Sequence, residues 1–118
     1  MFEIKGIEPA PQGSKRHVGN GRMIEASAKV KPWRFVVSQA ALESDYELTD
    51  RPVMVQITFM FSRPKSHYNS KGELKKTAPF YKSTKPDLDK LCRSTLDGIT
   101  NVLIKDDSQV VNLMCCKV

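Results

Sequence analysis

Residues 85–100 of this 118-residue chain read KPDLDKLCRSTLDGIT, and the other elements can be placed around this stretch. Its mostly apolar side chains recur at spacings of three and four, which is the period of an amphipathic helix. The pattern continues a few residues further and predicts a helix from about Leu88 to Thr100, after which Asn101 is suited to the left-handed turn that ends a helix. The residues that define it are Leu88, Leu91, Cys92, Thr95, Leu96, Ile99, Val102 and Leu103.

Strands are predicted on both sides of this helix. Residues 53–61 read VMVQITFMF, in which every second side chain from Val53 to Phe61 is apolar. A period of two is typical of a half-buried strand. Pro52 cannot donate to a β-ladder, so this strand begins there or just after it. Residues 109–117 are β-branched and apolar enough to form a final strand.

The first half of the chain predicts one more strand and one more helix. Residues 2–7 alternate apolar and polar, which indicates a strand. Pro32 suits the first turn of a helix, and the apolar residues that follow it have helical spacing, so a helix is predicted from Pro32 to about Ser44. Residues 9–31 and 62–84 have little periodicity and are predicted to be long loops. Loops of this length in a small domain are usually functional or mobile.

The predicted order of elements is therefore β-α-β-α-β, with no internal repeat. A chain of 118 residues is long enough for one hydrophobic core, so we expect a single domain over residues 1–118. The fold class that follows is α+β, a mixed sheet with two helices packed on one face.

Composition excludes several classes of protein. Hydrophobic residues make up 40% of the chain, and no apolar run approaches the length that crosses a bilayer. The first residues lack the pattern of a secretory signal, so a cytoplasmic protein is expected. The three cysteines, Cys92, Cys115 and Cys116, are odd in number and two of them are adjacent. That spacing predicts free thiols rather than a disulfide framework or a zinc site.

The net charge is +6, and the excess of positive charge lies mainly in the two predicted loops. Residues 13–34 contain six Lys and Arg against Glu25 alone, and residues 63–85 contain seven against Glu73 alone. Solvated basic loops are one explanation. The interpretation we favour is a surface for a phosphate backbone. The residues expected to bind DNA are Lys15, Arg16, Arg22, Arg63, Lys65, Lys75, Lys76, Lys82 and Lys85.

Four aspartates stand out in this basic chain. Asp87 and Asp89 lie just before the second helix, where Pro86 favours extended backbone that would point both carboxylates the same way. Asp106 and Asp107 precede the last strand, so one of them can reach the same place. Asp87 as a helix N-cap and the Asp106–Asp107 pair as a turn are the alternatives. Gathered carboxylates favour Mg²⁺ and predict a metal-dependent nuclease.

Arg93 lies four residues from both Asp89 and Asp97 on one side of the predicted helix. In that position its guanidinium can hold a phosphate or stabilise developing negative charge. The alternative is a simple ion pair along the helix surface, which would stabilise the helix by only a few tenths of a kcal/mol.

The sequences KPDLDKL (85–91), LDG (96–98) and DDSQVV (106–111) together resemble the RusA family of Holliday junction resolvases, which is known from phages and prophages. The resemblance is strongest over residues 63–117, where RPKSHY (63–68) also matches common members. Over the first half of the chain it rests on layout alone.

The resemblance implies a homodimeric endonuclease that uses Mg²⁺, with Mn²⁺ as an acceptable substitute, to make paired nicks in four-way DNA junctions. It implies metal-binding carboxylates at Asp87, Asp89 and Asp107, with Asp106 in a supporting role. It also implies a catalytic basic residue at Arg93, where family members often have lysine. An arginine keeps the charge there but cannot donate a proton at neutral pH. Family members usually continue into a further strand beyond the position of Val118.

Two other functions fit the same residues. A junction-binding or single-strand-binding module without cleavage would use charge together with stacking by Tyr68, Phe80 or Tyr81. A nuclease that prefers flaps or RNA duplexes is the other, because phosphate contacts do not specify the shape of the substrate. Divalent-ion-dependent nicking of a synthetic junction distinguishes cleavage from binding.

Overall fold

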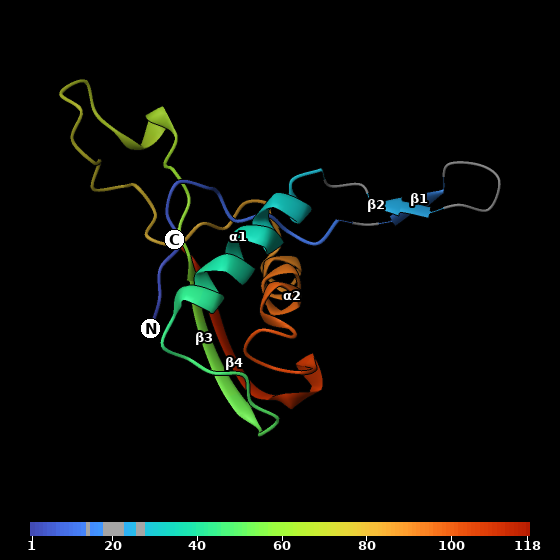
Figure 1. Cartoon of the computed structure of the whole chain (residues 1–118). Coiled ribbons are helices and arrows are strands. Elements are labelled where there is room, and N and C mark those ends of the chain that lie inside the picture. Colours follow the sequence, from blue (N-terminus) through green and yellow to red (C-terminus); the bar gives the residue numbers. More distant parts are fainter. Residues whose placement is uncertain (14, 18–22, 26–27) are drawn as a thin grey trace.

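A pair of helices packed against a parallel pair of strands forms the body of the molecule (Figure 1). The structure, a computed structural model, describes residues 1–13, 15–17, 23–25 and 28–118. In chain order its elements are the strands β1 (Lys15–His17) and β2 (Met23–Glu25), helix α1 (Val30–Glu43), strand β3 (Val53–Phe59), the 3₁₀ turn η1 (Lys65–His67), helix α2 (Leu88–Ile99), the 3₁₀ turn η2 (Asp107–Gln109) and strand β4 (Val110–Lys117). The expected small α+β fold is confirmed.

Strands β3 and β4 run parallel, with Ile57 opposite Cys115 and Phe59 opposite Lys117. Exposure alternates along β3, because successive side chains point to opposite faces of a sheet. Phe59 is buried in the core, whereas Met54 on the other face is 77% exposed. One face of this sheet therefore packs against the core, and the other face is open.

The two helices contact each other closely within that core. The Trp33 indole on α1 donates a hydrogen bond of 3.2 Å to Thr95 Oγ1 on α2, and both side chains are buried. Gly98 lies against Val37, so near that a Cβ at residue 98 would come within 2.8 Å of Val37 Cγ1. Residues 8–12 cross the helix pair, where Ser94 donates a hydrogen bond of 2.6 Å to the Ala10 carbonyl. Because Gly98 has no side chain, α2 can approach α1 this closely.

The strongest sequence patterns predicted their elements well. The expected helix at 88–100 and strand at 53–61 correspond to α2 and β3. Asn101 has a φ of 69°, so it supplies the predicted left-handed turn after α2. Pro32 lies in the first turn of α1, although that helix begins at Val30. The final strand begins at Val110 because residues 107–109 form η2 instead.

The predicted first strand was wrong. Residues 2–7 are irregular, although their burial alternates as expected, with Phe2, Ile4 and Ile7 packed against the core. Gly6 has a φ of 83°, which interrupts an extended backbone. The alternation therefore records which side chains are buried, but no neighbouring strand pairs with this segment in the described part of the chain.

The sheet also differs from the prediction. Among the described residues, β3 and β4 form a purely parallel sheet, while the antiparallel partners β1 and β2 form a separate hairpin within the predicted loop at 9–31. The β-α-β-α-β order and the mixed sheet are therefore not found, since the first strand is missing and a hairpin precedes α1.

Neither α1 nor α2 has the length and apolar composition needed to cross a membrane, and the described residues contain no other candidate.

Candidate active site

A pocket of about 580 Å³ opens between α2 and β4. It brings together three of the residues predicted from the sequence, Asp89 and Arg93 from α2 and Asp107 from η2. The remaining wall is apolar or contains sulfur, and it consists of Leu88, Cys92, Leu96, Leu113 and Cys115. Two acidic residues and an arginine, contributed by α2 and η2, thus line one water-accessible volume.

The adjacent residues Asp106 and Asp107 have different surroundings. The Asp106 carboxylate accepts a hydrogen bond of 2.9 Å from the Ser108 amide and forms one half of a capping box at the start of η2. Hydrogen bonds from Ser108 lower the pKa of Asp106 below its usual 3.8. Asp106 is therefore used by the local backbone, and Asp107 is the member of the pair that lines the pocket. This arrangement leaves Asp107, and not Asp106, as the member of the pair that could hold a metal in the pocket.

Gln109 holds the turn that carries Asp107, and our sequence analysis gave it no role. Its Oε1 accepts hydrogen bonds from the Lys105 and Asp106 amides at 2.7 and 3.0 Å. Its Nε2 donates to the carbonyls of Thr49 and Arg51 at 2.9 and 3.0 Å. Every donor of the amide is thus used. The spacing of an Asp followed three residues later by Gln is a capping-box signal that predicts this role.

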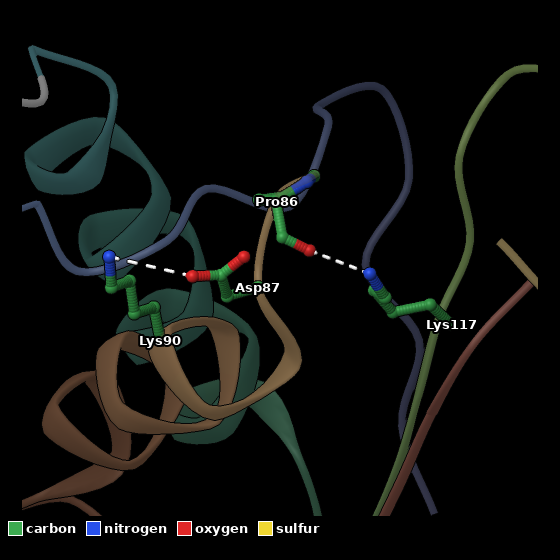
Figure 2. Close-up of polar contacts among 4 residues, drawn as sticks. All are labelled: Pro86, Asp87, Lys90 and Lys117. Carbon is green, nitrogen blue, oxygen red and sulfur yellow. Dashed lines mark hydrogen bonds and ion pairs between the residues drawn. The ribbon is translucent and has the colours of Figure 1, made fainter. Parts of the chain in front are cut away.

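Asp87 lies apart from the other two carboxylates. It occupies the N-cap position of α2, but its side chain makes no capping hydrogen bond. Its carboxylate instead pairs with Lys90 at 3.5 Å (Figure 2). Because the helix begins at Leu88, only Asp87 has extended backbone, and Asp89 already lies in the first helical turn. The expected extended backbone through both Asp87 and Asp89 is therefore not found, and helical geometry sets the direction of the Asp89 side chain instead.

Asp87 lines a second pocket, of about 460 Å³, next to the start of α2. Lysines dominate its charge, with Glu8 as the other acidic residue among those that line it. Lys82 and Lys85 were predicted to bind DNA, and the Lys82 ammonium lies 5.3 Å from the centre of the Phe61 ring. Lys29 and Lys90 complete the group. Two members of this basic group, Lys29 and Lys90, were absent from the predicted DNA-binding residues.

Arg93 is exposed on α2. Asp89 and Asp97 both lie in the described part of the chain, and neither forms an ion pair with Arg93. The simple helix-surface ion pair, which was the alternative role for Arg93, is thus not present. Its guanidinium is available at the pocket.

The two pocket carboxylates suit a magnesium ion. Mg²⁺ is usually held by one or two carboxylates and by substrate phosphate, and it keeps several of its waters. Asp89 and Asp107 in one open pocket meet that requirement. Within the residues that the structure describes, no three His, Cys, Asp or Glu side chains are grouped closely enough to hold a metal by themselves.

The other predicted DNA-binding residues are distributed over two regions. Arg63, Lys65, Lys75 and Lys76 lie in the connection between β3 and α2, which extends away from the body in Figure 1. Arg63 donates a hydrogen bond of 2.6 Å to the Pro79 carbonyl and helps to hold this connection together. The side chains of Lys15 and Arg16 in β1 are not described, and Arg22 lies outside the described residues.

The aromatic residues of the same connection are exposed to solvent. Phe80 and Tyr81 are 68% and 63% exposed, and their rings contact each other edge to face. Tyr68 is 39% exposed. These rings have the exposure that stacking on unpaired bases requires.

The cysteines are free thiols, as predicted. Burial, together with the neighbouring Cys92 thiol, raises the pKa of Cys115 to about 12. Cys115 is therefore protonated at neutral pH and forms part of an uncharged wall beneath Asp89 and Asp107. A neutral thiol is a poor ligand for hard cations such as Mg²⁺, which prefer oxygen.

Comparison with known proteins identifies the family. The family model described as "Endodeoxyribonuclease RusA" matches residues 6–118. A protein of Bacillus subtilis (strain 168), described as "Uncharacterized protein YqaN", is 32% identical over 121 residues, which cover 98% of this chain and 84% of the relative. The family match includes α2, η2 and β4, which form the pocket described above. The chain therefore belongs to the RusA endodeoxyribonuclease family.

Proposed function

We propose that this protein is a Mg²⁺-dependent endonuclease that resolves four-way DNA junctions by paired nicks, in recombination and repair. The observation that carries the proposal is the pocket that Asp89, Arg93 and Asp107 all line. Membership of the endodeoxyribonuclease family supplies the reaction class, hydrolysis of internal phosphodiester bonds in DNA.

Each pocket residue has a role in that reaction. Asp89 and Asp107 would hold the ion, which when bound would supply charge stabilisation and a more acidic water. Hydroxide derived from water attacks the phosphorus in line, the bond between phosphorus and the 3′ oxygen breaks, and that oxygen takes up a proton from water. The products carry a 5′-phosphate and a 3′-hydroxyl. Arg93 neutralises the extra negative charge on the phosphate in the transition state. It does not donate a proton, because its pKa is too high.

Asp87 is proposed as a third metal-binding carboxylate. Its side chain is free of the capping role that an aspartate at this position usually has. Its ion pair with Lys90 is half exposed, at 52% and 44% for the two side chains, so the pair is weak and its partners can exchange. The lysines around Asp87 suit a phosphate of the bound strand.

Paired nicks require two active sites, which a homodimer would provide. We propose a dimer on the ground of the family membership. Sedimentation of the free protein and of its junction complex measures this directly. A monomer that remains monomeric on a junction, and yet cuts both strands in one binding event, would contradict the dimer.

The experiment that tests the function is cleavage of a substrate panel with Mg²⁺, with Mn²⁺ and with neither. The panel holds a four-way junction, a flap, a linear duplex, a single strand and an RNA duplex. We expect nicks at symmetric positions in opposed strands of the junction, only when a divalent ion is present. Asp107→Asn is the matched control, because it removes a pocket carboxylate and keeps its shape.

Other outcomes identify the competing functions. Junction binding without cleavage under every ionic condition would indicate a binding module, whose base contacts would come from the exposed Phe80 and Tyr81. If flaps or RNA duplexes are cleaved faster than four-way junctions, the proposed phosphodiester hydrolysis stands, but the four-way junction is not the preferred substrate.

A further inference from the structure

Lys117, at the end of β4, contacts the segment that leads into α2. Its Nζ donates hydrogen bonds of 2.7 Å to the Thr84 carbonyl and 2.8 Å to the Pro86 carbonyl. Figure 2 shows the bond to Pro86 on one side of Asp87 and the Lys90 ion pair on the other. The Lys117 carbonyl in turn accepts a hydrogen bond of 3.0 Å from the Lys82 amide. A single residue of the sheet thus holds residues 82–86 at three points.

The bond to Pro86 bears directly on the orientation of Asp87. The Pro86 carbonyl and the Asp87 amide belong to one planar peptide group. When Lys117 holds the oxygen of that group in place, it also holds the backbone nitrogen of Asp87 in place. The remaining freedom of the Asp87 backbone is its own φ and ψ, which the start of α2 sets at −67° and 136°.

Other contacts that would orient Asp87 are few. Residues 83–86 belong to no helix or strand, and the Asp87 side chain makes no capping bond that would anchor it to α2. The Lys90 ion pair is half exposed and therefore weak. Within the described residues around this turn, the carbonyls of Thr84 and Pro86 have Lys117 as their hydrogen-bond partner. Lys117 is half-buried, so its two charge-assisted bonds are partly shielded from water.

We propose that Lys117 is a positioning residue, which holds the peptide group before Asp87 so that this carboxylate reaches the metal and phosphate site. The proposal rests on the proposed function of Asp87 as a metal ligand. Its chemical basis is a lysine whose charge is directed to backbone carbonyls instead of to a carboxylate or to DNA. An ammonium has three donors, and these bonds use two of them.

The test compares three substitutions in the full-length chain. Lys117→Met removes the ammonium and keeps the length of the stem, Lys117→Arg restores donors that can reach carbonyls, and Lys5→Met is the matched control. Lys5 is an exposed lysine whose contact is a loose ion pair with Glu3 at 3.7 Å, so its loss changes net charge by the same amount. Four quantities are measured: single-turnover cleavage of a four-way junction, the Mg²⁺ concentration at half-maximal rate, metal-free junction affinity, and amide hydrogen exchange over residues 84–88.

We expect Lys117→Met to cut roughly 10²-fold more slowly than Lys5→Met, which is the usual effect of a small misplacement of a reacting group. Its half-maximal Mg²⁺ concentration should rise, and exchange over residues 84–88 should become faster. Metal-free junction affinity should match that of Lys5→Met. Lys117→Arg should recover a substantial part of the rate and of the exchange protection.

Three results would overturn the proposal: a Lys117→Met rate equal to that of Lys5→Met, unchanged exchange over residues 84–88, or a loss of junction affinity as large as the loss of rate. The last would make Lys117 a direct DNA contact. If Lys117→Met does not fold, Lys117→Gln is measured in its place, because the amide can still donate to one carbonyl. The proposal that Asp87 is a metal ligand and the proposal that Lys117 positions it can be rejected independently. Asp87→Asn at full activity would reject Asp87 as a ligand, whereas the exchange experiment tests Lys117 without reference to cleavage.

Discussion

The side chains of Asp106 and Asp107 are chemically identical and adjacent, yet their neighbours give them different roles. Asp106 accepts the Ser108 amide, and Asp107 faces the pocket that also contains Asp89. We expect Asp107→Asn, Asp89→Asn and Asp87→Asn each to abolish junction cleavage. Metal-free junction binding should be retained or become tighter, because each change removes negative charge near phosphate.

Asp106→Asn is the control for this series, since an asparagine can accept the same hydrogen bond at a cap and should reduce cleavage less. Single-turnover rates and binding titrations without divalent ions measure both effects. Cleavage at the parent rate by any of the first three variants would remove that residue from the site. A loss in Asp106→Asn equal to that in Asp107→Asn would leave no basis for choosing between the two.

The lowered pKa of Asp106 predicts how the stability of the fold changes at low pH. Its pKa is lowered by the Ser108 hydrogen bonds, so the folded state favours the carboxylate more than the unfolded state does. This contribution to stability is present at neutral pH and is lost as the pH falls below 3.8 and through the folded-state pKa. We expect the parent to melt above Asp106→Ala at neutral pH, and the gap to narrow in acid. Melting curves at several pH values measure it, and a gap that does not change with pH would contradict it.

Arg93 distinguishes a catalytic charge from a surface charge. If the guanidinium holds the scissile phosphate, Arg93→Ala should lose roughly 10²–10³ in cleavage rate, about 3–4 kcal/mol of transition-state stabilisation. Arg93→Lys keeps the positive charge and should retain substantial activity. Single-turnover rates measured beside melting curves separate the effects on catalysis and on folding. An Arg93→Ala protein that cuts at the parent rate would reject the catalytic role.

At the scale of elements, the contact between α1 and α2 depends on Gly98. In an isolated helix, alanine is about 1 kcal/mol more favourable than glycine. Here a Cβ would lie 2.8 Å from Val37 Cγ1 and 3.3 Å from the Arg34 carbonyl, so the helices would have to separate. We expect Gly98→Ala to destabilise the fold by about 1–3 kcal/mol, as overpacking of a core does. Urea unfolding measures it against Gln39→Ala on the exposed side of α1, which should change stability by no more than about 0.5 kcal/mol. A stabilised Gly98→Ala would show that the helices move apart without cost.

Sequence periodicity correctly predicted those elements in which the buried side chains also belong to a hydrogen-bonded helix or strand. Helix α2 has one buried side and the backbone hydrogen bonds of a helix, strand β3 has one buried face and a ladder partner in β4, and both were predicted within a few residues. Residues 2–7 have the burial pattern of a strand but no ladder partner, so the same criterion failed there. The β1–β2 hairpin has strands of three residues, which are too short to show a period of two.

The site was predictable as a set of residues and not as a geometry. Residue type and spacing selected Asp89, Arg93 and one of the pair Asp106 and Asp107, and the family resemblance chose Asp107. Asp89, Arg93 and Asp107 line one pocket. The position of Asp87 relative to Asp89 depended on the residue at which α2 begins. Helix boundaries predicted from sequence are uncertain by about two residues, and a shift of that size reverses the direction in which a side chain points. The contacts of Lys117 join residues far apart in the sequence, so no local sequence pattern predicts them.

At the scale of the whole molecule, the net charge of +6 and the basic residues around the site predict how binding depends on salt. Each lysine or arginine that meets a DNA phosphate releases counterions. If about six phosphates are neutralised, the logarithm of the association constant should fall with the logarithm of salt concentration at a slope near −5. Titrations of a four-way junction without divalent ions over a range of salt concentrations measure the slope.

A control for this prediction is the variant Lys82→Gln with Lys85→Gln, two lysines that line the pocket around Asp87. Their loss should make the slope less steep by about one to two. A nearly flat salt dependence in the parent would mean that the basic segments do not contact the backbone of the DNA.

The parallel pairing of β3 and β4 has a consequence for the order of events during synthesis. Parallel neighbours need a long crossover, and here the crossover contains α2 and η2, which carry Asp89 and Asp107. Strand β4 supplies both the far wall of the pocket and Lys117, and it follows every other element of the described chain. A nascent chain that still has β4 inside the ribosome therefore lacks a formed site, although α2 has already emerged. We expect the ability to cut DNA to arise late and all at once, when the last strand docks.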